Sequence, residues 1–442
     1  MLPLIAVSLG YFMVILDATV VNVALPSLGR DLGGGVSDLQ WVVDGYTLVF
    51  AGLLLSAGSL GDLLGGRRVF EAGLWLFTIA SAACAAAPSV PVLVGARLLQ
   101  GLGAAMLVPS SLALLRAAYP DTRERARAVG IWGGVAGVAA ASGPIVGGLA
   151  VAAVSWRAVF FVNVPIGLLG LFLAARHLPP RTERIDSGLD PAGQVAGVLA
   201  LTLLTFGLIE GGDFGWTSPL AIAPLVAFPL AVAAFIALER RMSEPMLPLG
   251  LFRSHTFSGS SYVGLAINLG FYGQLFVISL YFQQVRGYSA LQTGLALLPM
   301  GIFVALSSVA SGKLTGRVGP RLPMLVGLSL AGLGFLGLMA AGADTSYAVL
   351  VAPLIAIGFG MAMTMPAATA AIIEAAPADR AGIASGVLNA SRQAGGAIGV
   401  ALLGTLVQSG AFVPGLHLAM AVAGAVFLSA AGVTALTVER RV

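Results

Sequence analysis

The sequence predicts an all-α integral membrane protein built from two six-helix bundles and two linker helices, with fourteen transmembrane helices in total. Composition supports this class, since 58% of the 442 residues are hydrophobic and only 10% are charged. A water-soluble core cannot bury so much apolar surface. A helix that crosses a hydrocarbon layer about 30 Å thick needs about 20 apolar residues, and the chain repeats runs of that length.

Fourteen apolar runs can be read along the chain, separated by short segments rich in charge, Gly and Pro. They cover residues 3–26, 40–60, 69–87, 91–115, 128–152, 158–175, 192–210, 219–238, 257–283, 289–311, 322–341, 346–367, 383–408 and 415–437. Many runs contain some of the 59 Gly and 23 Pro residues. This is ordinary for membrane helices, because neighbouring helices satisfy the backbone groups that these residues leave free.

The distribution of basic residues predicts the orientation. If the N-terminus is inside, eighteen Lys and Arg residues fall in inner loops and the C-terminal tail, whereas the outer loops hold only Arg30, Arg157 and Arg286. This bias favours a multi-pass protein of the cell inner (plasma) membrane with both termini in the cytoplasm. It also favours an even number of helices, and the first apolar run is too long for a cleavable signal peptide.

Several function classes are excluded by what the chain lacks. The net charge of +4 comes from dispersed loop residues, so no basic tract indicates nucleic-acid binding. No phosphate-binding loop and no Ser-His-Asp set occurs, and the three His residues are scattered. Cys84 is the single cysteine, so no internal disulfide forms. The sequence therefore predicts neither an enzyme nor a bound cofactor or metal.

Two long polar segments divide the chain into matched halves. Residues 177–193 and 239–259 concentrate Pro and charge. We therefore expect an N-terminal six-helix bundle over residues 1–176, inner loops with two linker helices over 177–256, and a C-terminal six-helix bundle over 257–442.

An internal repeat supports this division. GSLGDLLGGR (58–67) and GKLTGRVGPR (312–321) share Gly, Leu, Gly and Arg at one constant offset. Both segments lie at the inner end of the second helix of their half. Secondary transporters are commonly built from repeated halves, with the substrate site between them near the middle of the membrane.

Asp17 is the first candidate for a functional residue, because it lies inside the apolar run MVILDATVVNVALP (13–26). An ionised Asp at the centre of a bilayer costs about 2.5 to 3.5 kcal/mol, so its side chain must face the protein interior or water. Arg97, in the fourth span, is the natural partner, and Gln100 lies on the same helical face. We interpret Asp17 as a proton site tuned by Arg97. The alternative is a static ion pair that only fixes helix packing.

Asp44 is the second acidic residue well inside a span, in WVVDGYTL (41–48) of the second helix. It is a candidate for proton or substrate binding, although its position near the outer end also allows contact with interfacial water. Other polar side chains within spans are candidates to line a substrate cavity, and each has interhelical hydrogen bonding as its alternative. These residues are Asn22, Tyr46, Gln100, Asn268, Tyr272, Gln274, Asn389, Arg392 and Gln393.

Five ordered segments carry a resemblance to a known family. They are LDATVVNVALP (16–26), GSLGDLLGGRR (58–68), RLLQGLGAA (97–105), GVAAASGPIVGG (137–148) and WRAVFFVNVPIG (156–167). Together they resemble the successive motifs of the fourteen-helix drug:proton antiporters of the major facilitator superfamily, and YFQQVRGYSALQTGLALLPMG (281–301) resembles the same family. The resemblance implies two six-helix bundles, two extra helices and export of a small amphiphilic compound in exchange for protons. It also implies that Arg97 lies on the path of the proton and the substrate.

The inner loop after the second helix is a candidate gate. A carboxylate such as Asp62 that pairs with Arg67, Arg68 or a helix N-terminus in only one conformation biases the equilibrium between two states. The glycines of this motif are Gly58 and Gly65. A simple cluster of charges that ends the span is the alternative. The family motif usually has basic residues where this chain has Leu63 and Gly66, which weakens the expected charge lock.

The fifth helix is the second candidate gate, because Gly143, Pro144 and Gly147 let helices approach closely and disrupt the local hydrogen-bond ladder. The resemblance assigns this element to antiport, although this chain has Ala139 where the family has Gly. Ordinary tight packing also explains these residues.

The sequence thus predicts a proton-coupled secondary transporter that exports drugs or antibiotics by alternating access. Its expected partners are a small-molecule substrate, protons and the lipid bilayer, and it is expected to act as a monomer. The alternatives are a proton symporter or facilitator for a small metabolite, and a membrane sensor that does not transport.

Overall fold

The computed structural model describes residues 1–178, 190–242, 245–377, 380–408 and 411–439. Within these ranges, a few side chains fall outside the description, those of Asp62, Thr122, Arg123, Ala126, Ser308 and Val309. The described chain is helical almost throughout. The helices of the first half are α1 (Leu2–Leu32), α2 (Val36–Leu64), α3 (Gly66–Ala86), α4 (Val90–Ala118), α5 (Thr122–Ala153), α6 (Ala158–Phe161) and α7 (Asn163–His177).

Two linker helices and the second half follow. The linker helices are α8 (Pro191–Phe214) and α9 (Pro219–Glu239), and the short helix η1 (Leu249–Arg253) precedes the second half. The second half comprises α10 (His255–Leu280), η2 (Tyr281–Val285), α11 (Ala290–Ala296), α12 (Leu298–Val318), α13 (Arg321–Gly337), η3 (Leu338–Ala340), α14 (Tyr347–Glu374), α15 (Ala381–Gln408) and α16 (Phe412–Thr437).

The number of long helices agrees with the fourteen predicted spans. Thirteen segments of the described chain are long and apolar enough to cross a membrane, and α6 with α7 and α11 with α12 each count as one of them. α15 is the fourteenth long helix, with 28 residues. Its polar stretch around Asn389 and Arg392 makes it less apolar than the others. The predicted all-α membrane fold is therefore confirmed.

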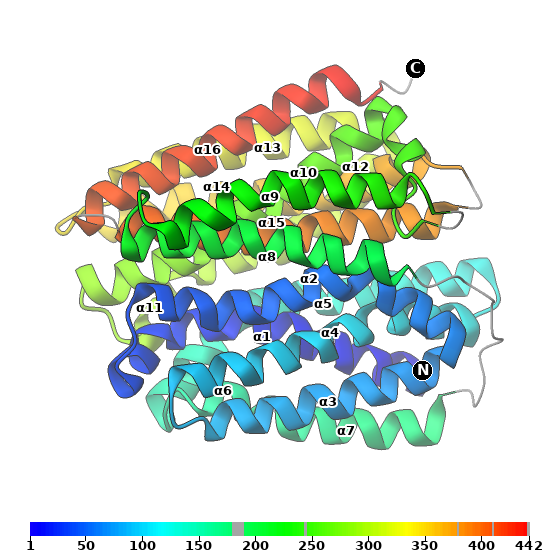
Figure 1. Cartoon of the computed structure of the whole chain (residues 1–442), viewed down its shortest axis with the longest axis horizontal. Coiled ribbons are helices and arrows are strands. Elements are labelled where there is room, and N and C mark those ends of the chain that lie inside the picture. The colour runs from blue at the N-terminus through cyan, green and yellow to red at the C-terminus, as the bar shows by residue number, and fades with distance from the viewer. Residues whose placement is uncertain (179–189, 243–244, 378–379, 409–410, 440–442) are drawn as a thin grey trace.

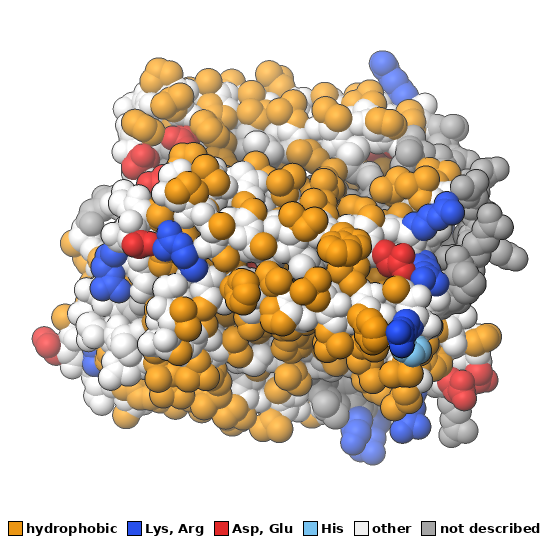
Figure 2. Space-filling model, turned by 90° about the horizontal axis from the view of Figure 1, so that it is seen from below, with side chains coloured by type: hydrophobic (Ala, Val, Ile, Leu, Met, Phe, Trp, Pro, Cys, Tyr) orange, Lys and Arg blue, Asp and Glu red, His pale blue; other side chains and the backbone are white. Residues whose placement is uncertain are grey.

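The helices form two bundles that lie side by side, α1–α7 in one and α10–α16 in the other (Figure 1). α8 and α9 pack on each other, and α8 also contacts α2 of the first bundle and α15 of the second. α1 begins and α16 ends at the same end of the molecule (Figure 1). One face seen in Figure 2 is mostly hydrophobic across its middle, with charged side chains towards both ends, as expected for a protein surrounded by lipid.

The two ends of the bundles differ in how the halves meet. We call the end with the α2–α3 loop and Arg67 the basic end, and the end with the α1–α2 loop the opposite end. Towards the opposite end α5 packs tightly against α11 and α12: a Cβ on Gly148 would lie 2.8 Å from the carbonyl oxygen of Ala290, and one on Gly301 would lie 3.1 Å from that of Ala141. Nearer the basic end, a Cβ on Gly137 would find nothing within 4 Å. α5 and α12 therefore separate towards the basic end.

Candidate functional site

Asp17 lies at the centre of a buried polar network inside the first bundle. Its side chain is 0% exposed, and that of Arg97 is 1% exposed. Arg97 Nη1 forms an ion pair with Asp17 Oδ2. Gln100 Nε2 and Asn163 Nδ2 each donate a hydrogen bond of 2.8 Å to Asp17 Oδ1. Both oxygens of this carboxylate are thus held by side chains from α4 and α7.

The guanidinium of Arg97 is satisfied by several other groups. Its Nε donates to the carbonyl oxygen of Val42 at 2.9 Å, and its Nη1 donates to Gln100 Oε1 at 2.7 Å. Its Cζ lies 4.3 Å from the centre of the Tyr46 ring. A cation over an aromatic face gains about 2 kcal/mol when it is desolvated. The pair is thus fully compensated, as a charge at membrane depth must be.

Close helix contacts bring these groups together. A Cβ on Gly103 of α4 would lie 2.8 Å from the backbone nitrogen of Phe77 in α3, and one on Gly101 would contact the carbonyl oxygen of Tyr46 in α2. Only glycine allows α4 to approach both neighbours so closely. The sequence RLLQGLGAA therefore supplies both the polar side chains and the small residues that position them.

Asn163 was missed by the sequence analysis. It begins α7, is 0% exposed and donates to Asp17. The signal was an amide inside the apolar stretch FFVNVPIG, within a segment already recognised as part of a motif.

Asp44 lies apart from this network. It is 0% exposed, and neither of its carboxylate oxygens has a hydrogen-bond partner among the described residues. Contact with interfacial water, one of the two expectations for this residue, is therefore absent in this conformation. Gln40 and Thr47, on the same face of α2, both contact α15. Asp44 consequently faces the boundary between the two bundles.

Arg392 is a second cation within a span, half-buried on α15. Its Nε is buried without a partner among the described residues, and its Nη1 donates to Asn389 Oδ1 at 3.2 Å. Tyr11 of α1 and Tyr272 of α10 lie within electrostatic reach of its guanidinium. The ring of Tyr11 stacks on that of Trp132 in α5, with centroids 3.9 Å apart. Aromatic groups from both bundles therefore gather near an arginine that has no acidic partner among the described residues.

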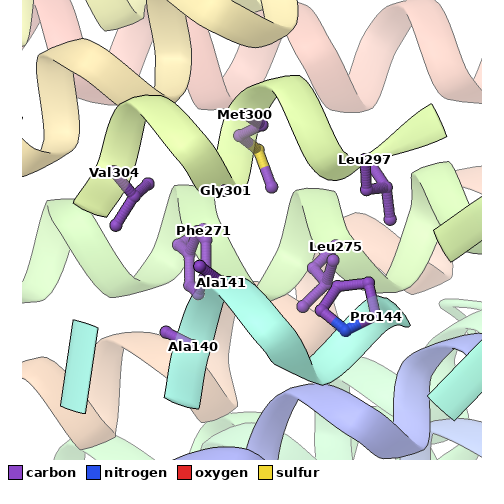
Figure 3. A pocket seen from close by; sticks show the side chains of 9 residues that line it. All are labelled: Ala140, Ala141, Pro144, Phe271, Leu275, Leu297, Met300, Gly301 and Val304. Carbon is purple, nitrogen blue, oxygen red and sulfur yellow. The ribbon is translucent and has the colours of Figure 1, made fainter. Parts of the chain in front are cut away.

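A small apolar hollow lies between α5 of the first bundle and helices of the second (Figure 3). α5, α10 and the α11–α12 segment line it, and the view in Figure 3 shows the side chains converging from these elements. The residues that line it are Ala140, Ala141, Pro144, Phe271, Leu275, Leu297, Met300, Gly301 and Val304. This surface supplies an apolar wall between the halves.

The remaining cavity candidates are mostly turned into the helix packing. Tyr46 is 1% exposed and donates its hydroxyl to the carbonyl oxygen of Val14. Asn22 donates to Ala18 of its own helix. Asn268 and Gln274 are buried, and the Nδ2 of Asn268 and both amide atoms of Gln274 have no partner among the described residues. Tyr272, Asn389 and Arg392 lie at the bundle boundary, and Tyr46 lies within electrostatic reach of Tyr272 across it. Gln100 lies in the Asp17 network.

The inner-loop motif forms an anchor in each half. Gly65 has φ of +94° and its repeat partner Gly319 has φ of +77°, a backbone region in which only glycine is unstrained. Arg67 donates to the carbonyl oxygens of Ala175 (2.9 Å) and Leu178 (2.8 Å) at the end of α7. Its repeat partner Arg321 donates in the same way to Ala435 (2.6 Å) and Val438 (3.2 Å) at the end of α16.

These bonds link the repeat to the helix termini, where carbonyl groups attract cations. Arg67 also forms an ion pair of 2.8 Å with Glu71. The expected partner Asp62 lies outside the described side chains, and Arg68 is exposed. A Cβ on Gly58 would lie 3.8 Å from Pro109, an ordinary contact.

The glycines of the fifth helix contact α1. A Cβ on Gly143 would clash with the side chain of Thr19, and one on Gly147 would lie 2.6 Å from the carbonyl oxygen of Val20. The carbonyl oxygen of Pro144 faces Gly294 of α11. α5 is therefore wedged between α1 of its own bundle and the other bundle.

Comparison with known proteins identifies relatives of this chain. The family description "Major Facilitator Superfamily" matches residues 7–400. The chain is 42% identical to the multidrug resistance protein Stp of Mycobacterium tuberculosis over 409 residues. This alignment covers 92% of this chain and 76% of that protein. It is 38% identical over 406 residues to the methylenomycin A resistance protein of Streptomyces coelicolor, which covers 91% of this chain and 85% of that protein.

A relative in Streptomyces glaucescens, the tetracenomycin C resistance and export protein, is 38% identical over 407 residues, which are 92% of this chain and 76% of that protein. Among solved structures, an inward-facing, occupied crystal structure of a bacterial homologue of the human lysosomal transporter Spinster matches with a TM-score of 0.69. That match covers 98% of this chain and 96% of that chain at 16% identity, so it supports the fold alone. The chain belongs to the Major Facilitator Superfamily and is a membrane transporter of that family.

Proposed function

We propose that this chain is a proton-coupled exporter of small amphiphilic compounds that works by alternating access, with Asp17 as the proton carrier. The observation that carries the proposal is the buried network in which Arg97, Gln100 and Asn163 surround the Asp17 carboxylate. A charge held inside an apolar bundle is costly, and in membrane proteins such groups commonly belong to proton or ion pathways.

Protonation of Asp17 changes the packing of the helices that meet at this network. A proton removes the negative charge that holds Arg97 and weakens the two amide hydrogen bonds from α4 and α7. Arg97 keeps its bond to Val42 of α2. Because α1, α2, α4 and α7 all meet at this network, one proton alters the preferred arrangement of the bundle. This is the local charge event that a two-state transporter requires.

The asymmetry between the two ends supports alternating access. The bundles meet closely at the opposite end, whereas α5 and α12 separate towards the basic end. The excess of arginine supports a cytoplasmic location for the basic end and both termini. With this orientation in the cell membrane, the conformation described here is the one of the two required states that is open to the cytoplasm.

The names of the relatives support small-molecule export, since they refer to multidrug resistance and to antibiotic resistance and export. A proton that moves inward down a potential of 100 mV supplies about 2.3 kcal/mol. We propose the monomer as the functional unit, with the halves divided at the two polar loops. The apolar hollow and the group around Arg392 form the substrate region between the halves.

The proposal is tested by proton release from the purified full-length protein. The protein is titrated with a panel of acidic, neutral and cationic aromatic compounds in weakly buffered solution, and wild type is compared with Asp17→Asn. Asp31→Asn is the matched control, because Asp31 lies on the same helix but is 49% exposed and pairs with Arg157. We expect proton release on binding from wild type and from the control, and none from Asp17→Asn.

Other outcomes discriminate between the alternatives. Release that persists in Asp17→Asn assigns the proton to another group, first of all Asp44. Binding without release in any variant contradicts proton exchange and favours a facilitator or a sensor. Uptake of substrate together with protons into proteoliposomes identifies a symporter.

A further inference from the structure

The basic end of the linker helices holds two buried carboxyl groups that the transport mechanism does not use. Asp190 caps the N-terminus of α8 and is 5% exposed, and Glu239 ends α9 and is 3% exposed. Asp190 Oδ1 accepts a hydrogen bond of 2.8 Å from the backbone of Gly193. Glu239 Oε2 accepts one of 2.9 Å from the backbone of Leu247. Each carboxyl therefore has one oxygen satisfied by a backbone amide.

The two remaining oxygens face the same point. Asp190 Oδ2 and Glu239 Oε1 are both buried, and neither has a donor among the described residues. A Cβ placed on Gly193 would contact both of them, at 2.6 Å in the case of Glu239. The two side chains lie within hydrogen-bonding reach of each other. Two acceptors thus face each other, and no described residue places a donor between them.

No cationic side chain among the described residues compensates the two negative charges that ionised Asp190 and Glu239 would carry. The ion pairs formed by described side chains do not include either residue. Arg240 and Arg241, which follow Glu239, are exposed, as is Arg253 at the end of η1. From α2 the pair is approached by the neutral Ser56, which bonds Gln194 of α8. The charged residues of α2 are Asp38 near its start, Asp44 and Asp62, whose side chain is outside the description.

Two ionised carboxylates within hydrogen-bonding reach of each other repel, and the repulsion is strong where water is excluded. One proton resolves the conflict, because a protonated carboxyl donates to the other and satisfies both free oxygens. Carboxyl pairs that share one proton for this reason are known in proteins. A divalent cation is the other possible solution, but the described residues offer it only these two oxygens.

We propose that Asp190 and Glu239 bind one proton between them and that this proton fastens the linker helices at the basic end. The shared proton joins the start of α8 to the end of α9 and to the loop at Leu247. Gln194, one turn into α8, donates to the carbonyl oxygen of Gly52, so the fastened end of α8 is also held against α2. Loss of the proton separates the two helix ends by repulsion and loosens this contact.

Infrared spectroscopy of the purified full-length protein in detergent tests the proposal without any measurement of transport. Spectra are recorded between about pH 4 and about pH 9, the range in which buried carboxyls titrate. Wild type is expected to show a protonated-carboxyl band that is absent from Asp190→Asn and from Glu239→Gln, whereas any band from Asp17 or Asp44 is retained in both variants. Asp344→Asn, a change in an exposed loop residue at the opposite end, is expected to retain the band.

Thermal unfolding over the same pH range provides a second readout. The native pair holds a proton that the separated carboxyls of the unfolded chain release more readily, so its stabilising contribution is present at low pH and is lost as pH rises. We expect the wild-type unfolding midpoint to fall with rising pH. In Glu239→Gln an amide N–H replaces the shared proton at every pH, so the fall is expected to be smaller. Asp190→Ser removes the carboxyl but keeps a side chain that can cap the helix, so it replaces Asp190→Asn in both measurements if the Asn variant does not fold.

Two results would overturn the proposal. One is a protonated-carboxyl band and a pH slope that are the same in wild type, Glu239→Gln and Asp190→Ser. The other is an unfolding midpoint that magnesium or calcium raises in wild type but not in the variants, because the pair then holds a cation instead of a proton. Neither result bears on proton exchange at Asp17, which is measured separately.

Discussion

Gln40 of α2 donates its side-chain Nε2 to the carbonyl oxygens of Val400 (3.0 Å) and Ala401 (2.8 Å) in α15, and so joins the two bundles near the opposite end. Gln40 is 0% exposed. A Cβ on Gly404 would lie 2.5 Å from the same nitrogen, so glycine is required for the contact. A second bond between the halves, from Gln408 to Ser37 at 2.8 Å, lies about two turns further along α15.

We predict that Gln40→Ala shifts the protein towards the conformation that is open at the opposite end. Two buried hydrogen bonds are lost, each worth about 1 kcal/mol, so the ratio of the two conformations should change by about tenfold or more. Gly404→Ala should act in the same direction, because its Cβ displaces the Gln40 side chain. The measurement is the distance between spin labels at Gly35→Cys and Ala411→Cys in a Cys84→Ala background.

The matched control is Gln292→Ala, because Gln292 caps α11 within a single bundle. Its distance distribution should equal that of the unsubstituted pair. An unchanged distribution in both Gln40→Ala and Gly404→Ala would show that this contact does not hold the halves together.

The Asp17–Arg97 pair should behave as one energetic unit. Arg97→Gln leaves a buried carboxylate without its cation, which typically destabilises a protein by about 3 to 5 kcal/mol. The double variant Asp17→Asn/Arg97→Gln should recover most of this loss, because amides can bond to each other, yet it should exchange no protons. Thermal unfolding of the four forms in detergent gives the coupling. Additive losses from the two substitutions would contradict a direct pair.

Much of the fold and part of the site could be predicted from the sequence. Apolar runs are long and regular because every helix must cross the same hydrocarbon layer, so the number of helices could be predicted. The pairing of Asp17 with Arg97 was accessible for a related reason: each is too costly to leave alone in lipid, and each was the prominent charge of its span. The repeat around Gly65 and Gly319 predicted two equivalent loops, and both loops have glycine at positive φ.

Other parts depend on three-dimensional contacts that no local pattern reveals. Asn163 was overlooked because one amide in an apolar run looks like an ordinary interhelical bond. Asp190 and Glu239 are 49 positions apart in sequence and become neighbours only because α8 and α9 form an antiparallel pair. The contact of the Tyr46 ring with Arg97 likewise joins two helices, α2 and α4, and no local pattern shows it.

Arg392 should select for acidic substrates. Its guanidinium has no acidic partner among the described residues, and a carboxylate or phenolate on the substrate would supply the missing charge. We predict that Arg392→Gln weakens binding of an acidic aromatic probe by about tenfold to a hundredfold, as expected for a lost hydrogen bond to a charged group. Arg392→Lys should restore part of it. Equilibrium dialysis with an acidic probe and its neutral amide gives the comparison, and equal losses for both would contradict a charge interaction.

The small residues of α5 should have different roles along its length. Gly148, Pro144 and Ala141 face the other bundle, and Gly137, Gly134 and Gly130 continue the same helical face towards the basic end, where nothing lies within 4 Å of a Cβ placed on these three glycines. Gly312 and Gly316 of α12 are likewise open. In a transporter that alternates between two states, these bare segments are the surfaces that meet when the basic end closes.

A large side chain at Gly137 should therefore be tolerated in the present conformation and block closure. We predict that Gly137→Leu folds and binds substrate but transports little, and that labels at Arg127→Cys and Lys313→Cys stay far apart when substrate is added. Gly137→Ala should leave transport nearly unchanged, and its higher helix propensity should raise stability by about 1 kcal/mol. Gly147→Ala, by contrast, should lower stability by about 1 to 3 kcal/mol, because its Cβ would lie 2.6 Å from the carbonyl oxygen of Val20. Normal transport by Gly137→Leu would mean that this face of α5 never meets the other bundle.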